Sequence, residues 1–122
     1  MQRNIEFLKQ IKHIFKNTYF FGPHITPNIN MSPSNLKQLS KIYLQEKAIY
    51  KFVEVDKLLK KYSNLNNINF ISKIELINYD IENDFYINNK YTFSDKDHWS
   101  SYGENIFGKR LLKNNIILKI LL

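Results

Sequence analysis

The chain has 122 residues, no cysteine and a formal net charge of +7. That length fits a single domain, and a composition with 43% hydrophobic and 15% aromatic residues is too apolar for a disordered chain. The absence of cysteine excludes disulfides and thiolate metal sites.

The basic charge has two interpretations. A nucleic-acid or anionic-membrane surface would gather basic residues on one block or face, whereas the lysines here are scattered along the chain. Lys, Asn, Ile, Tyr and Phe, which AT-rich codons favour, are all abundant. We therefore favour coding bias and do not expect nucleic acid as a partner, although a small basic nucleic-acid-binding module remains the alternative.

The N-terminal segment predicts a helix and then a strand. Apolar residues recur at near-helical spacing, at Ile5, Leu8, Ile11 and Phe15. No continuous apolar stretch of a signal peptide is evident, and no apolar run approaches the ~20 residues of a membrane span, so the compartment stays unknown. Residues 18–21, Thr-Tyr-Phe-Phe, predict a short buried strand that ends at Gly22-Pro23.

The middle of the chain predicts a long helix and a second strand. Ser32 is the expected N-cap and Pro33 the first helical residue. The apolar pattern continues to Tyr62, with a break near residues 46–48 left open. Residues 68–71, Ile-Asn-Phe-Ile, predict the second strand. A helix between two strands is a crossover connection, so parallel strands and an α/β fold are expected.

The C-terminal third predicts a hairpin and a final helix, while residues 72–83 give no clear assignment. Residues 85–93 carry aromatic side chains on both sides of Asn88-Asn89, which is consistent with a small hairpin. The final helix should begin after Ser100 or Ser101. Its predicted apolar face includes Ile106, Phe107, Leu111 and Ile117.

The residues best suited to chemistry are Asp95 and His98. They are three positions apart in a polar loop that leads into the final helix. A serine hydrolase needs an imidazole that accepts the serine proton, and a carboxylate that orients the imidazole and stabilises its charged form. One tight loop could hold both groups, although Asp and His at this spacing also occur by chance in capping loops.

The residues around this pair make the signal more specific. The stretch Tyr91-Thr-Phe-Ser-Asp-Lys-Asp-His-Trp-Ser-Ser-Tyr-Gly103 resembles the last sequence block of the SGNH (GDSL-like) hydrolase superfamily. It is most similar to the SGNH domain fused to membrane acyltransferases of the O-antigen acetylase type, in which Asp-x-x-His is followed by Leu-Ser-x-x-Gly-Ala. Here Trp99 replaces the leucine and Glu104 replaces the alanine.

The resemblance implies a partial, flavodoxin-like three-layer α/β fold with few short parallel strands and three main helices. His98 would be the general base and acid, Asp95 would orient it, and Gly103 would allow close approach of the last helix. The strands at residues 18–21 and 68–71 would be the fourth and fifth of the SGNH sheet. The substrate would be an acyl ester or a glycan, in O-acetylation or deacetylation.

The nucleophile block of that superfamily is not found in residues 1–122, because none of the three glycines is followed by Asp-Ser. We therefore expect a single partial domain over residues 1–122, inactive alone. A separate chain or a membrane acyltransferase would supply the serine half. A non-functional gene remnant remains a further alternative. An unpaired strand edge in such a half-domain predicts self-association.

The other two histidines are interpreted as residues without a catalytic role. His24 follows the first predicted strand, where it could face a substrate, but a satisfied or solvated loop residue is the favoured interpretation. His13 is expected on the surface of the first helix. No spacing of His, Asp and Glu indicates a metal, and no glycine-rich loop indicates a nucleotide cofactor.

Overall fold

A computed structural model describes residues 2–12, 14, 18–27, 36–45 and 47–121. The chain is a mixed α/β protein that is mostly helical and has a few short strands, which confirms the predicted α/β class. His13, Phe15, Ser32 and Pro33 lie outside the described residues. Within the described part of the chain, no helix combines the length and apolar character needed to span a membrane.

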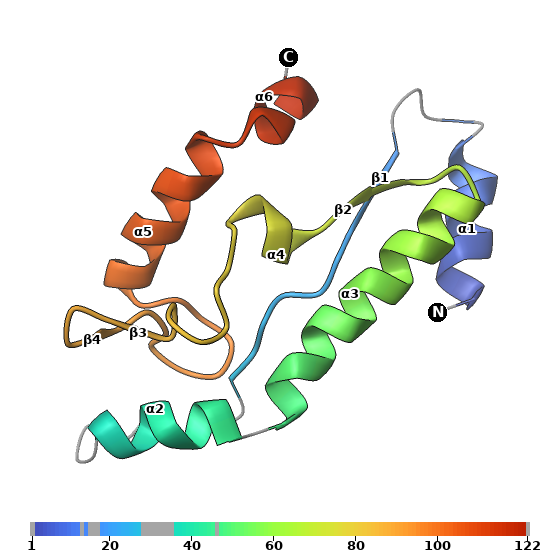
Figure 1. The fold of residues 1–122 in the computed structure, drawn as a ribbon. Helices are drawn as coiled ribbons and strands as arrows, with labels where there is room; N and C mark the ends of the chain where they lie inside the picture. The colour runs from blue at the N-terminus through green and yellow to red at the C-terminus, as the bar shows by residue number, and fades with distance from the viewer. Residues whose placement is uncertain (1, 13, 15–17, 28–35, 46, 122) are drawn as a thin grey trace.

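Two strands that are far apart in the sequence form a parallel pair. Strand β1 (Tyr19–Phe21) pairs with β2 (Asn69–Ile71) in the register Tyr19↔Asn69, Phe20↔Phe70 and Phe21↔Ile71. The long helix α3 (Lys47–Leu65) lies between them in sequence and packs along β2, as a crossover connection does (Figure 1). The predicted parallel arrangement is confirmed, and Gly22-Pro23 ends β1 as predicted. The prediction that this strand is buried is wrong, because Tyr19 and Phe20 are half-buried and Phe21 is exposed.

The helical region of the middle of the chain consists of two helices. Helix α2 (Leu36–Gln45) is followed by α3, and the two lie at an angle to each other (Figure 1). The break falls within the segment that the sequence left open. Helix α1 (Gln2–Lys12) lies near the N-terminal ends of the two strands, where the Lys12 ammonium donates a 2.7 Å hydrogen bond to the Asn67 carbonyl.

The segment that the sequence left unassigned contains the short helix α4 (Lys73–Leu76). The Ser72 hydroxyl stabilises the start of this helix by accepting a hydrogen bond from the Glu75 amide. The predicted hairpin is confirmed as β3 (Tyr86–Ile87) and β4 (Lys90–Tyr91). Both asparagines of its turn have positive φ, 48° at Asn88 and 60° at Asn89. Asparagine tolerates this conformation better than most residues, so the local sequence favours the two-residue turn.

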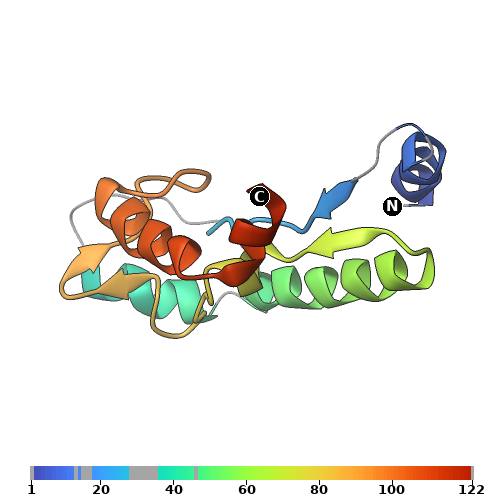
Figure 2. The ribbon, with the colours of Figure 1, turned by 90° about the horizontal axis from the view of Figure 1, so that it is seen from above.

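The main core joins the hairpin to the last helices. Helix α5 (Ser101–Leu112) buries Phe107 completely and is followed by α6 (Asn115–Leu121), so the predicted face of the final helix is divided between two helices. The rings of Tyr43 and Phe85 stack at 4.1 Å between centroids. Figure 2 shows α2 and α3 along one side of the molecule, with α1, α5 and α6 toward the other.

A buried ion pair fixes α5 to the segment after α4. The Arg110 guanidinium forms a two-pronged contact with the Asp84 carboxylate, with Nη2 at 2.8 Å from Oδ1. The Asp84 side chain is only 4% exposed. The same guanidinium also donates to the Asn78 carbonyl at 3.2 Å. Because the planar guanidinium matches a carboxylate bidentately, this pair fixes the orientation of α5 against the segment between α4 and β3.

Candidate functional site

The loop between β4 and α5 is closed by its own hydrogen bonds. Asp95 Oδ1 accepts from the amides of Asp97, at 2.7 Å, and His98, at 2.8 Å. The Ser94 amide donates to the His98 carbonyl at 2.9 Å. A side-chain carboxylate that accepts backbone amides two and three residues later is the usual way in which aspartate fixes a tight turn. The spacing of Asp95 and His98 therefore shapes the loop.

The same carboxylate binds the imidazole of His98. Nδ1 of His98 lies 2.9 Å from Oδ2 and 3.0 Å from Oδ1 of Asp95. With the Nδ1 proton directed at the carboxylate, Nε2 is the nitrogen that can accept a proton from an incoming group. The His98 side chain is 76% exposed, so Nε2 is accessible to a group that approaches from outside the loop.

The electrostatics of the pair follow from these contacts. The hydrogen bond that the His98 ring donates to Asp95 raises the pKa of His98 above its usual 6.5, because it favours the charged imidazolium. The amide of Asp97 lowers the pKa of Asp95, and the hydrogen bonds from His98 act in the same direction. Asp95 therefore stays ionised while His98 exchanges its proton, and this is the division of roles that an orienting carboxylate and a general base require.

Residues on either side of the loop anchor it to the core. The backbones of Phe93 and Trp99 form a β-bridge at its base, and the Trp99 indole packs against Phe107 with 4.9 Å between centroids. The Ser100 hydroxyl accepts from the Gly103 amide and so caps α5. The predicted helix start and Ser100 cap are confirmed.

Gly103 has a specific steric role. A Cβ atom built at this position would lie 1.9 Å from the Thr92 carbonyl oxygen. Thr92 belongs to the strand side of the loop, and its carbonyl accepts the Ser100 amide at 2.9 Å. The predicted close approach of the last helix at Gly103 is confirmed, since only a residue without Cβ fits there.

His24 lies beneath the same loop, which the sequence did not predict. Its ring is 5.5 Å from the Trp99 ring and 6.1 Å from the Phe93 ring, between centroids. The backbone of Asp97 lies within hydrogen-bonding reach of the ring. Burial, and then the charge of Lys73, lowers the pKa of His24 below 6.5, so this histidine is held neutral at pH 7.

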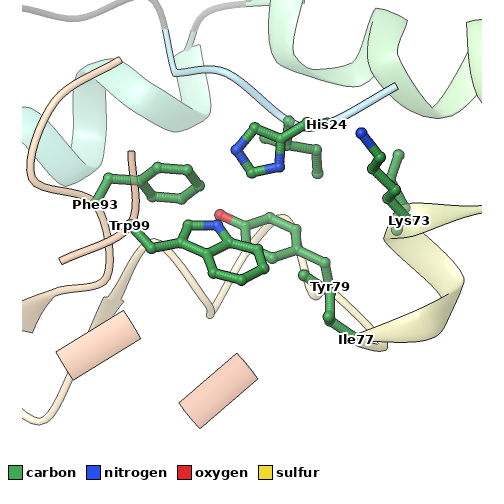
Figure 3. Close-up of a pocket in the computed structure, with 8 residues that line it drawn as sticks. His24, Lys73, Ile77, Tyr79, Phe93 and Trp99 are labelled. Atoms are coloured by element: carbon green, nitrogen blue, oxygen red, sulfur yellow. The ribbon is translucent and has the colours of Figure 1, made fainter. Parts of the chain in front are cut away.

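His24, Trp99 and Tyr79 line a small cavity (Figure 3). Its volume is about 10 Å³, close to the minimum that holds one water molecule. The Trp99 Nε1 atom is buried and has no hydrogen-bond partner among the described residues. The cavity is therefore too small for a substrate.

The described residues do not place a nucleophile against His98. The nearby hydroxyls are already directed at backbone carbonyls: Ser94 donates to His98 at 3.2 Å and Ser100 to Tyr91 at 2.6 Å. No group of three or more His, Asp or Glu side chains in the described ranges could hold a metal ion. This part of the chain thus presents an oriented imidazole with no hydroxyl directed at it among the described residues.

The structure brings Asp95 and His98 together as the sequence indicated, and it adds His24 and Trp99 to their surroundings. Only the position of His24 after a strand end hinted at its proximity, because carboxyl ends of strands are where α/β folds gather functional groups. Comparisons of the chain with protein-family models, with curated proteins and with solved structures find no match.

Proposed function

We propose that Asp95 and His98 are the carboxylate and the general base of an SGNH-type acyl-ester hydrolase or O-acyltransferase site. The observation that carries this proposal is the 2.9 Å contact between the Asp95 carboxylate and His98 Nδ1, which leaves Nε2 exposed. The Asp95 carboxylate that fixes the turn also reaches the His98 ring, so the turn itself presents the imidazole in one orientation. A dyad needs this contact, since the carboxylate selects the tautomer that makes Nε2 basic.

In the proposed reaction, a serine supplied by a polypeptide segment outside residues 1–122 attacks an ester carbonyl. His98 Nε2 accepts the serine proton and then returns it to the departing alcohol, which leaves an acyl-serine. Water or a glycan hydroxyl next gives its proton to His98 and attacks the acyl group, and the proton finally returns to the serine. Asp95 stabilises the imidazolium in both halves of the cycle.

The fold supports this proposal at a coarse level. Strands β1 and β2 would be the fourth and fifth strands of a flavodoxin-like sheet, with α3 as the crossover helix between them. Parallel sheets are ordinarily larger and covered on both faces. A serine-bearing segment that adds strands beside β1 would complete the sheet and bring its nucleophile to the edge where the strands end.

The first test of the proposal is to sequence the DNA upstream of the Met1 codon and to translate it in all three frames. A strand pattern followed by Gly-Asp-Ser supports the proposal, and the protein that joins that segment to residues 1–122 should hydrolyse p-nitrophenyl acetate. A second serine-bearing chain from the same gene neighbourhood serves equally well when added in trans. If neither source carries a Gly-Asp-Ser block, the proposal fails.

Variants of the reconstituted protein test the roles of the two residues. His98→Ala should lower kcat by at least about 10³-fold, and Asp95→Asn by about 10²- to 10⁴-fold, because the imidazole then loses its orientation. Asp97→Asn is the matched control: it removes a carboxylate from the same loop, and the Asp97 side chain does not hydrogen-bond His98 among the described residues. Full activity in His98→Ala would contradict the proposal.

A further inference from the structure

Helix α3 carries a second apolar surface that its own fold does not use. Its inner side is buried at a seven-residue interval, at Ile49, Asp56 and Ser63. On the outer side, four large residues remain 43–70% exposed: Val55, Leu58, Tyr62 and Leu65. Scattered exposed apolar residues are ordinary, but a row of four along one helix usually marks an interaction surface.

The spacing of this row is that of a helix-packing seam. Val55, Leu58, Tyr62 and Leu65 follow each other at intervals of three, four and three residues, and the same register extends back through Lys51 to Ala48. These six residues form what we call the outer stripe. A 3.5-residue period is the a/d pattern by which one helix receives another, and it is narrower than the broad face that a helix buries in a globular core.

The outer stripe leads into a hollow that can receive a side chain. A pocket of about 340 Å³ lies between the start of α3 and the segment that follows β1. Ala48, Phe52 and Val55 line it from α3, and Pro23 and Thr26 line it from the opposite side. An apolar side chain that enters such a hollow is the usual anchor of a protein interface, because it becomes fully desolvated there.

The charges along the outer stripe indicate the chemistry of its partner. Lys51 lies within the stripe, and Lys47 and Lys61 lie beside it, while Glu54 is the one acidic residue on that flank. Among the described residues, the acidic side chains that form ion pairs contact other lysines, Arg110 or His98. The lysines of the stripe are therefore available to pair with carboxylates across an interface.

We propose that the outer stripe of α3 binds an amphipathic helix of another polypeptide, with an apolar a/d seam and acidic residues on its flanks. A second copy of this chain would bring a second set of lysines to the outer stripe, and the net charge of +7 opposes a dimer built on this face, whatever the strand edge does. A flat anionic membrane could meet the lysines, but it could not fill a hollow walled by Pro23 and Thr26. A side chain from a helix can.

The probe is a synthetic peptide of about three heptads with Leu at a and d and Glu at e and g. The matched control peptide carries Lys in place of Glu. Titration calorimetry with the whole chain at about 50 mM NaCl should detect binding of the acidic peptide and not of the basic one, and about 500 mM NaCl should weaken the binding. Equal binding of the two peptides, or binding of neither, overturns the proposal.

Two variants locate the binding surface. Leu58→Glu places a charge in the centre of the outer stripe and should weaken the acidic peptide by at least about tenfold. Leu118→Glu on α6 is the control, because Leu118 is 47% exposed and Leu58 is 49% exposed. Circular dichroism establishes that both variants keep their helices. Unchanged affinity in Leu58→Glu overturns the proposal.

Two further measurements separate the other occupants. Sedimentation of the chain alone, in wild-type and Leu58→Glu forms, detects a dimer built on the stripe. Cosedimentation with phosphatidylglycerol vesicles and with neutral phosphatidylcholine vesicles detects a membrane surface. A dimer that Leu58→Glu dissociates would overturn the proposal and make a second copy of the chain the partner of the outer stripe. Vesicle binding that depends on Leu58, without peptide binding, would overturn it and make a membrane surface the partner.

Discussion

The loop between β4 and α5, which carries Asp95 and His98, is called the dyad loop below. The two glycines of α5 provide a matched test of how that helix supports it. A Cβ at Gly103 would meet the Thr92 carbonyl oxygen at 1.9 Å, where ordinary contacts begin at 3.4 Å, so helix and strand must separate by about 1.5 Å. The obstacle is backbone and cannot rotate away. Such overpacking costs about 1–3 kcal/mol, and the better helix propensity of alanine returns at most about 1 kcal/mol.

We therefore expect Gly103→Ala to lower the free energy of unfolding by about 1–2 kcal/mol, or Tm by roughly 4–8 °C for a domain of this size. Gly108 lies in the same helix, and a Cβ there meets nothing within 4 Å. Gly108→Ala should raise stability by about 0.5–1 kcal/mol. Urea denaturation followed by circular dichroism measures both. If Gly103→Ala is as stable as wild type while Gly108→Ala gains stability, the close approach at Thr92 does not exist in solution.

Three other substitutions test buried or partly buried charges. Arg110→Met should lower the free energy of unfolding, measured by urea denaturation, by about 3 kcal/mol, because it leaves the buried Asp84 carboxylate without its partner. A decrease of less than about 1 kcal/mol would show that water replaces the guanidinium. Burial raises the pKa of Asp56, so the folded chain keeps the Asp56 proton to a higher pH than the unfolded chain and loses stability as pH rises above 3.8. Asp56→Asn should remove this pH dependence and raise the free energy of unfolding at pH 7 by on the order of 1 kcal/mol. A lower free energy of unfolding in Asp56→Asn would instead assign the carboxylate a stabilising contact. The pKa of His24 is lowered by burial and by Lys73, so below pH 6.5 the unfolded chain binds a proton at this residue more readily than the folded chain does. The free energy of unfolding should therefore fall from about pH 7 to pH 5 more in wild type than in His24→Gln. Parallel pH profiles of the two proteins would contradict this.

The features predicted correctly from the sequence depend on neighbouring residues. Asn88-Asn89 tolerates the positive φ of a two-residue turn, and the Ser100 hydroxyl caps the helix by accepting from Gly103, so local backbone preference decided the first and local hydrogen bonding the second. The contact between Asp95 and His98 was predictable for the same reason, because the carboxylate reaches both the amide and the ring of a residue three positions later.

The features that the sequence did not predict depend on contacts between distant segments. His24 and Trp99 are brought together by the packing of the post-β1 segment against the dyad loop. Arg110 and Asp84 are 26 residues apart, and each alone reads as an ordinary surface charge. The sequence indicated a possible break near residues 46–48, but without a proline or glycine there it did not give the angle between α2 and α3, which depends on what each helix packs against.

The separation between paired strands has a consequence for the order in which the chain folds. The contacts of the dyad loop span only two to four residues, and a loop of that size closes on a timescale of tens of nanoseconds. The pairing of Tyr19 with Asn69 must instead close a segment that includes all of α3, at a far larger entropic cost. The Asp95–His98 contact can thus form in a chain in which β1 and β2 have not yet paired. Observing that contact therefore shows that the loop is ordered, but not that the sheet has formed.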